Sequence, residues 1–179
     1  MNRRSMLKTA SAAAMGGAVL TGCSTPDVTA YSGQTPAFDL RSYFNGNVQA
    51  RGMFRDRAGK IVRRFVVVLQ CEWRGDQGVL DESFTYDDGE KQRRIWRLTD
   101  LGQNRYLGLA DDVVGQAHGQ GSGNAFRWQY TLRLPVDGTT YDVELDDWMV
   151  LIDERTVINV ATMSKFSVRL GEVTLAFTK

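Results

Sequence analysis

The chain has 179 residues, 42% of them hydrophobic, and a formal net charge of +1 at pH 7. Residues 1–22 carry three basic residues and no acid, so the rest of the chain has 19 basic and 21 acidic residues. This near-neutral body argues against a nucleic-acid partner, which requires a clustered basic face, and its length suits one domain with one hydrophobic core.

Residues 1–22 have the layout of an export signal. A basic start with Arg3, Arg4 and Lys8 is followed by the Ala- and Gly-rich run "TASAAAMGGAVL" at 9–20. This run is too short and too weakly apolar to be a stable membrane span. We therefore predict a signal peptide over residues 1–22.

The end of this segment resembles a bacterial lipobox. The motif is "LTGC" at 20–23, and in a lipobox the cysteine thiol is diacylated and becomes the new N-terminus. The resemblance implies lipidation of Cys23, and the following Ser24 implies sorting to the outer membrane, facing the periplasm. The alternative is an ordinary leader with an incidental cysteine.

The start of the segment resembles a twin-arginine export signal. "NRRSMLK" at 2–8 contains the arginine pair, Arg3 and Arg4, followed by one variable residue, one bulky apolar residue, Leu and Lys. Twin-arginine export moves folded proteins, so the resemblance implies that the domain folds before export.

The second cysteine is expected to be structural. If Cys23 carries lipid, Cys71 has no disulfide partner. In "RFVVVLQCEWR" at 64–74, Cys71 alternates in phase with Leu69 and Trp73, as a core-facing residue of a strand does. We expect a buried thiol rather than a reactive one.

The region before the main domain reads as a spacer. Residues 23–37 are polar, contain proline and show no periodicity, so we expect a lipidated tether that holds the domain off the membrane. "FDLRSYF" at 38–44 suggests a short helical turn capped by Asp39. The predicted domain spans residues 38–179.

From here the chain reads as short strands separated by turns. Asp-Gly and Gly-rich groups tolerate positive φ and are typical of hairpin turns. They occur in "DRAGK" at 56–60, "GDQG" at 75–78, "DDGE" at 87–90, "TDLGQN" at 99–104, "GQGSGN" at 119–124, "VDGT" at 136–139, "DER" at 153–155 and at Gly171.

The strands between these turns alternate in polarity. In "AFRWQYTLRL" at 125–134, Phe126, Trp128 and Tyr130 face one side and the basic residues face the other. Strands with one apolar face must curl to bury it, and a sandwich or a closed barrel achieves this. We predict an all-β fold, an antiparallel up-and-down barrel of about eight to ten strands, because closure removes exposed edges.

The opposite face argues against a barrel that spans the outer membrane. Arg127, Arg133, Lys91, Arg93 and Arg97 would point outward, and charges there would be costly against lipid.

Motifs for common chemistries are missing from the sequence. "GQGSGN" lacks the Lys-Ser/Thr ending of a phosphate loop, and no Gly-x-Ser-x-Gly elbow occurs. The one histidine, His118, lies in a Gly-rich stretch without His or Cys neighbours, so a zinc site is not expected. We predict no metal, no cofactor and no assigned catalytic residue.

Acidic residues gather in "YDVELDDWMVLID" at 141–153. On a strand, Asp142, Glu144, Asp146 and Trp148 share a face. We expect a solvated face paired with neighbouring arginines, and a calcium site is the alternative.

Polar-tipped aromatics and charged residues fall in phase with the apolar faces. A packed core has little use for ring N–H and O–H groups, whereas a ligand cavity uses a few placed polar groups among apolar walls. The alternative is that the rings simply fill the barrel. The residues that we predict to contact a ligand are Glu82, Tyr86, Arg94, Trp96, Trp128, Tyr130 and Trp148.

Several segments together resemble one protein family. They are "FDLRSYFNGNVQARGMFRDRAGKIVRRF", "LDESFTYDDGEKQRRIWRL", "YLGLADDVVGQAHGQGSGNAFRWQYTL" and "DDWMVLID". They resemble a group of bacterial lipoproteins known as domain of unknown function 3833, from about Phe38 to Phe177. The resemblance implies a lipocalin-like (calycin) barrel in the cell envelope and an association with membrane fatty acids. The Gly-x-Trp of lipocalins is absent, since Gly46 is followed by Asn47 and Val48.

Three functions remain open at this stage. The first is a membrane-anchored lipoprotein whose barrel binds a fatty acid, another lipid or a small apolar ligand, with Arg94 pairing with a head group. The second is an enzyme that uses Glu82, Asp146 or His118 on a bound lipid. The third is a non-catalytic envelope assembly protein with a filled barrel and a protein partner that the sequence does not identify.

Overall fold

The computed structural model describes residues 26–136 and 138–179. The predicted signal peptide, the arginine pair Arg3 and Arg4, and the predicted lipidation site Cys23 lie outside the described residues.

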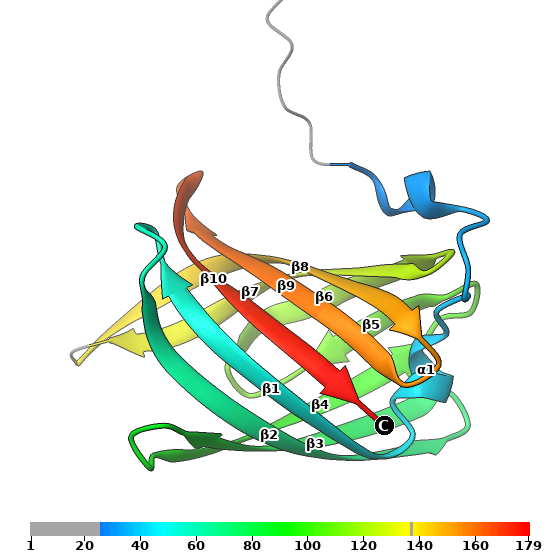
Figure 1. Ribbon diagram of the computed structural model, residues 1–179, viewed down its shortest axis with the longest axis horizontal. Coiled ribbons are helices and arrows are strands. Elements are labelled where there is room, and N and C mark those ends of the chain that lie inside the picture. Colours follow the sequence, from blue (N-terminus) through cyan, green and yellow to red (C-terminus); the bar gives the residue numbers. More distant parts are fainter. Residues whose placement is uncertain (1–25, 137) are drawn as a thin grey trace, which may run out of the picture.

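Within these residues, ten antiparallel strands form a closed barrel (Figure 1). The strands are β1 (Gly46–Asp56), β2 (Ile61–Arg74), β3 (Gln77–Tyr86), β4 (Lys91–Asp100), β5 (Arg105–Leu109), β6 (Val113–Ser122), β7 (Ala125–Val136), β8 (Thr139–Asp153), β9 (Thr156–Lys165) and β10 (Val168–Thr178). Each pairs with its neighbours in sequence, and β1 pairs with β10, which closes the barrel. The predicted up-and-down barrel is confirmed.

The alternation of side chains explains this architecture. On β2, Val67, Leu69 and Cys71 are buried while Val66 and Val68 between them are exposed. A period of two places every second residue inside the barrel. The barrel therefore buries one face of each strand in a shared interior.

A short helix closes one end of the barrel. Helix α1 (Leu40–Tyr43) begins at Asp39, whose carboxylate accepts a 2.6 Å hydrogen bond from the N–H of Ser42, as predicted. Phe38 and Phe44 on either side are 1% exposed, and the carbonyl of Phe44 accepts a 2.7 Å hydrogen bond from the indole N–H of Trp73. This is the closed end, at the right of Figure 1.

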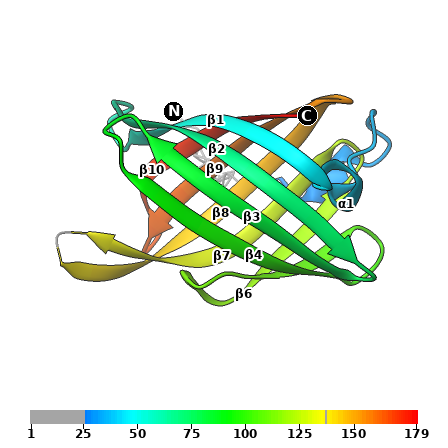
Figure 2. The same cartoon turned by 90° about the horizontal axis from the view of Figure 1, so that it is seen from below.

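The opposite end of the barrel is the mouth. The connections β1–β2, β3–β4, β5–β6, β7–β8 and β9–β10 lie there, whereas the other four connections lie beside α1 (Figures 1 and 2). This placement follows from the meander, because consecutive hairpins turn at alternate ends.

Two turn assignments from the sequence were wrong, and one turn was missed. Gly171 belongs to β10, and the turn before it falls at Phe166 and Ser167, which both have positive φ. Residues 119–122 belong to β6, where a Cβ on Gly119 would approach the rings of Phe126 and Trp128 to 2.7 Å. This glycine makes room for packing. The turn between β5 and β6 was not predicted, because "ADD" carries no glycine or proline.

Part of the predicted tether lies against the barrel. The 3-10 helix η1 (Val28–Tyr31) is capped by Asp27, and its Val28 is 4% exposed. The ring of Tyr31 packs against the outward-facing Trp148, with ring centroids 5.7 Å apart. The sequence did not predict this contact, because the segment is polar and shows no periodicity. Only one of its described side chains, Val28, is a buried aliphatic residue.

None of the described helices is long and apolar enough to cross a membrane.

Candidate functional site

The barrel encloses a cavity of about 460 Å³. Pockets for small ligands range over roughly 300–1,000 Å³ and are mainly apolar with a few placed polar groups. The floor of this cavity, at the closed end, is formed by Leu40, Phe44, Val67, Leu98 and Phe177. Its apolar collar, near the mouth, is formed by Phe54, Leu132, Leu134, Met163 and Val173.

Six of the seven predicted ligand-contacting residues line this cavity. They are Glu82, Tyr86, Arg94, Trp96, Trp128 and Tyr130. Their shared phase with the apolar side chains of β3, β4 and β7 was the signal that identified them. Whether they bind a ligand stays a prediction.

Trp148 does not line the cavity, so its placement there was wrong. On β8 the inward positions are Leu145, Asp147 and Met149, which are buried. Trp148 therefore points outward, where the guanidinium of Arg127 lies 5.1 Å from its ring centroid. Its indole belongs to the outer surface of the barrel.

The aromatic wall has defined geometry. Trp96 stacks on Trp128 with ring centroids 6.3 Å apart and an angle of 22° between the planes. Trp96 also meets Tyr130 edge-on, at 5.4 Å and 83°. Such pairs gain about 0.5–1.5 kcal/mol beyond area burial, so they hold this wall in place.

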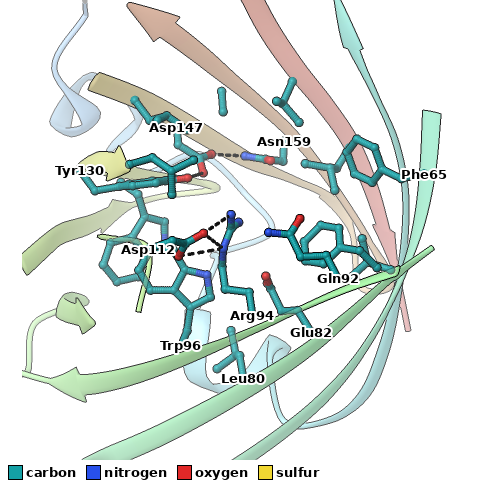
Figure 3. Close-up of a pocket in the computed structure, with 18 of the residues that line it drawn as sticks. Phe65, Leu80, Glu82, Gln92, Arg94, Trp96, Asp112, Tyr130, Asp147 and Asn159 are labelled. Carbon is teal, nitrogen blue, oxygen red and sulfur yellow. Dashed lines mark hydrogen bonds and ion pairs between the residues drawn. The ribbon is translucent and has the colours of Figure 1, made fainter. Parts of the chain in front are cut away.

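Arg94 points into the lumen and is already paired. Its Nε and Nη2 donate hydrogen bonds of 2.9 and 2.7 Å to Oδ2 of Asp112, which lies in the β5–β6 connection (Figure 3). Both side chains are largely shielded, with exposed fractions of 19% and 28%. The guanidinium therefore has a fixed carboxylate partner.

Glu82 faces Arg94 across the β3–β4 pair but makes no hydrogen bond or salt bridge among the described residues. Its carboxyl group points into the lumen (Figure 3). Burial raises its pKa to about 7, with Arg94 lowering it and Asp112 and Asp147 raising it further. Glu82 is half-buried, and its exposed part faces the cavity.

Asp147 lies on the opposite wall of the lumen. It accepts hydrogen bonds from the side-chain amide of Asn159 and, at 3.4 Å, from the hydroxyl of Tyr130 (Figure 3). Burial raises the pKa of Asp147 to about 6, and the bonds from Asn159 and Tyr130 oppose this increase. Asp147 thus accepts protons near neutral pH in the same cavity as Glu82.

We define the polar belt as the six charged or hydrogen-bonding residues between floor and collar. They are Glu82, Arg94, Asp112, Tyr130, Asp147 and Asn159.

Sequence reasoning missed three members of the polar belt. Asp147 alternates with Leu145 and Met149, and Asn159 alternates with Val157 and Ala161, so their phase would have identified both. Asp147 was missed because the neighbouring Asp142, Glu144 and Asp146 were assigned to an acidic outer face. Asp112 carries no such signal, because it lies in a turn that the sequence did not predict.

The acidic row of β8 lies on the outer surface, as expected. Asp146 pairs with Arg127 at 2.5 Å, and Asp142 lies 3.8 Å from Arg133. Asp146 is therefore not available as an acid inside the barrel. Among the described residues, no group of three or more His, Cys, Asp or Glu side chains could hold a metal ion.

The remaining candidate side chains are outside the cavity lining. His118 is exposed on β6, paired across the sheet with Leu107 and Gln129. Cys71 is 3% exposed, and burial raises the pKa of its thiol to about 12, which suits the predicted structural role.

Comparison with known families gives one match. The family described as "Protein of unknown function (DUF3833)" matches residues 17–179. No curated protein matches the chain.

Proposed function

The chain belongs to the family DUF3833, and from its barrel we propose that it is an envelope lipoprotein that holds an amphipathic ligand with a long apolar chain. The acyl group on Cys23 anchors it in the outer membrane, facing the periplasm. The ligand belongs to the fatty-acid and lipid class.

The observation that carries this proposal is the cavity itself. A barrel filled by side chains would favour an assembly role, but here about 460 Å³ remains between the floor and the mouth. Apolar walls that desolvate a chain, combined with a polar belt that can hold one polar group, are what an amphipathic ligand requires.

The anchoring part of the proposal is supported by the lipobox-like "LTGC" and by the position of η1. Asp27 caps η1 on the barrel wall, so at most four residues connect Cys23 to the folded domain. Four extended residues span about 14 Å. An anchor at Cys23 therefore keeps the barrel at the membrane surface.

Native mass spectrometry of residues 24–179 after incubation with an envelope lipid extract tests the proposal. We expect a reproducible adduct of lipid mass. Ala161→Trp should abolish it, because Ala161 is buried and lines the cavity, so an indole there fills the lumen.

The matched control for this variant is Thr162→Trp. Thr162 is the next residue on β9 and points to the other face of the sheet. An adduct that survives Ala161→Trp, or a clean apo mass across lipid classes, contradicts the proposal.

A second candidate function is favoured by Glu82. A carboxyl group with a pKa of about 7 in a largely apolar cavity suits general acid–base catalysis, and Glu82 points into the lumen on the same face of β3 as Tyr86. An enzyme would change the mass of a bound lipid over time. That change should disappear in Glu82→Gln while the adduct itself remains.

A further inference from the structure

The polar belt has an unequal balance of charge. Within the part of the lumen that the structure describes, the belt holds one guanidinium, Arg94, and three carboxyl groups, Glu82, Asp112 and Asp147. Such a belt favours ligands that bring protons or positive charge.

We propose that the ligand end buried in the polar belt is a hydrogen-bond donor, an ammonium or a hydroxyl group, rather than a carboxylate or phosphate. This inference rests on the proposed function, since it assigns a polar end to the ligand of that cavity. It also replaces the sequence-based expectation that Arg94 pairs with an anionic head group.

Arg94 already has a carboxylate partner. It makes three hydrogen bonds to Asp112, from Nε to both carboxylate oxygens and from Nη2 to Oδ2. The ring of Phe84 lies 5.7 Å from the guanidinium carbon. An incoming carboxylate would have to displace Asp112 and leave it buried without a partner, which is costly.

The belt also has unused acceptor capacity at its two other carboxyl groups, Glu82 and Asp147. Glu82 has no hydrogen-bond partner among the described residues, and an ionised carboxylate only accepts. Asp147 receives one hydrogen bond from Asn159 and one from Tyr130, and a carboxylate has about four acceptor sites. An ammonium group between these two walls can donate to both carboxylates, and a hydroxyl group can donate to one of them.

Two other arginines, Arg63 and Arg133, also line the cavity. Arg63 stacks 3.6 Å from the ring centroid of Tyr86 and pairs with Asp88 and Glu90, all in or beside the mouth. Arg133 is 57% exposed and lies beside Asp142 on the outer surface. Neither supplies a free positive charge at the depth of the belt.

The charged groups around Glu82 determine how the net charge of the polar belt changes with pH. Arg94 faces it from β4, Asp112 from the β5–β6 connection and Asp147 from β8, while Asp81 lies on the outer face of β3, paired with Arg93. Tyr130 on β7 stays neutral, since burial raises its pKa well above the usual value. Ionisation of Glu82 and Asp147 thus makes the belt more negative as pH increases.

Isothermal titration calorimetry with three ligands of one chain length tests the inference. The ligands are dodecylamine, dodecanol and dodecanoate, below their micelle concentrations, with residues 24–179 of the barrel at pH 8. We expect dodecylamine and dodecanol to bind at least about tenfold more tightly than dodecanoate, a difference of about 1.4 kcal/mol. Between pH 8 and pH 5.5, dodecylamine should bind more weakly and dodecanoate more strongly.

Substitutions in the polar belt test whether its carboxyl groups cause the preference for the amine over the carboxylate. Glu82→Gln together with Asp147→Asn should bring the amine and the carboxylate to within about threefold of each other. Glu72→Gln, an exposed position that faces outward on β2, should leave the preference unchanged. If the double variant does not fold, the pH series on the natural sequence still decides the question.

The outcomes distinguish failure of the proposed function from failure of the inference about the polar end of the ligand. If none of the three ligands binds, the proposed function fails and the inference fails with it. If dodecanoate binds most tightly at pH 8, the cavity binds an amphipathic ligand but the inference about its polar end is overturned.

Discussion

Oδ2 of Asp112 lies 2.7 Å from Nη2 and 2.9 Å from Nε of Arg94, so the arginine that enters the lumen from β4 has a carboxylate partner from the β5–β6 connection. The two residues come from adjacent segments of the sheet and meet inside the barrel. Their pairing converts a cationic group into part of a neutral pair, and it leaves Glu82 and Asp147 to set the character of the polar belt.

Removing this pair should destabilise the barrel. Arg94→Met leaves Asp112 and Glu82 in the lumen without their cation, and we expect a loss of about 1–3 kcal/mol of unfolding free energy. Arg93→Met is the matched control, since Arg93 is the next residue, points outward and pairs with Asp81 at the surface. That change should cost about 0–1 kcal/mol.

Urea unfolding at pH 7, followed by far-UV circular dichroism, measures both variants. Equal losses for Arg94→Met and Arg93→Met would show that the lumenal pair has no special role in stability.

The stability of the barrel should depend on the two lumenal carboxyl groups in the neutral range. Folding raises the pKa of Glu82 from 4.5 to about 7 and that of Asp147 from 3.8 to about 6. Between the ordinary and raised values the folded protein holds protons that the unfolded chain has released. Their contribution is therefore complete below the ordinary values and is lost as pH increases through about 6 and 7.

The measurement is the midpoint of urea unfolding between pH 5 and pH 8, without ligand. The midpoint should decrease with increasing pH in the natural protein and change less in Glu82→Gln/Asp147→Asn. The difference between the two proteins removes the contribution of surface carboxylates such as Asp81 and Asp87, whose lowered pKa values act below this range. A midpoint that increases through this range in the natural protein, relative to the variant, contradicts the assigned directions.

The barrel was predictable from the sequence because its strands repeat one simple rule. The alternation of Phe126, Trp128 and Tyr130 against charged neighbours fixed which side chains face inward, and the same rule placed Glu82 and Arg94 in the lumen. The ion pairs and hydrogen bonds between side chains inside the barrel could not be predicted. Asp112 reaches Arg94 because β5 is short and pairs only with Arg97–Asp100 of β4, so the β5–β6 connection lies near Arg94. This depends on the three-dimensional fold.

The packing of the closed end gives a direct test of the fold. Phe44 is 1% exposed and its ring lies 5.3 Å from that of Phe177. Phe44→Ala should lower the unfolding free energy by about 3–5 kcal/mol through the cavity that it leaves. Phe166→Ala, at a residue that is 88% exposed, should change it by no more than about 0.5 kcal/mol. Similar losses in urea unfolding would contradict this packing of α1 against the barrel.

Lipidation can be tested separately from ligand binding. Cells fed an alkyne-tagged palmitate should incorporate the tag into the full-length protein, and Cys23→Ser should remove both the tag and the membrane association. Cys71→Ala should keep the tag, because Cys71 is buried in the barrel. A Cys23→Ser protein that remains labelled and membrane-bound would contradict the anchor without bearing on the cavity.

The central claim is that the lumen holds an amphipathic molecule, and a crystal structure of residues 24–179 with dodecanol tests it most directly. We predict continuous density that begins between Glu82 and Asp147 and runs through the apolar collar towards the mouth. A lumen that contains only water at saturating dodecanol, or a ligand bound only on the outer surface, would contradict the account.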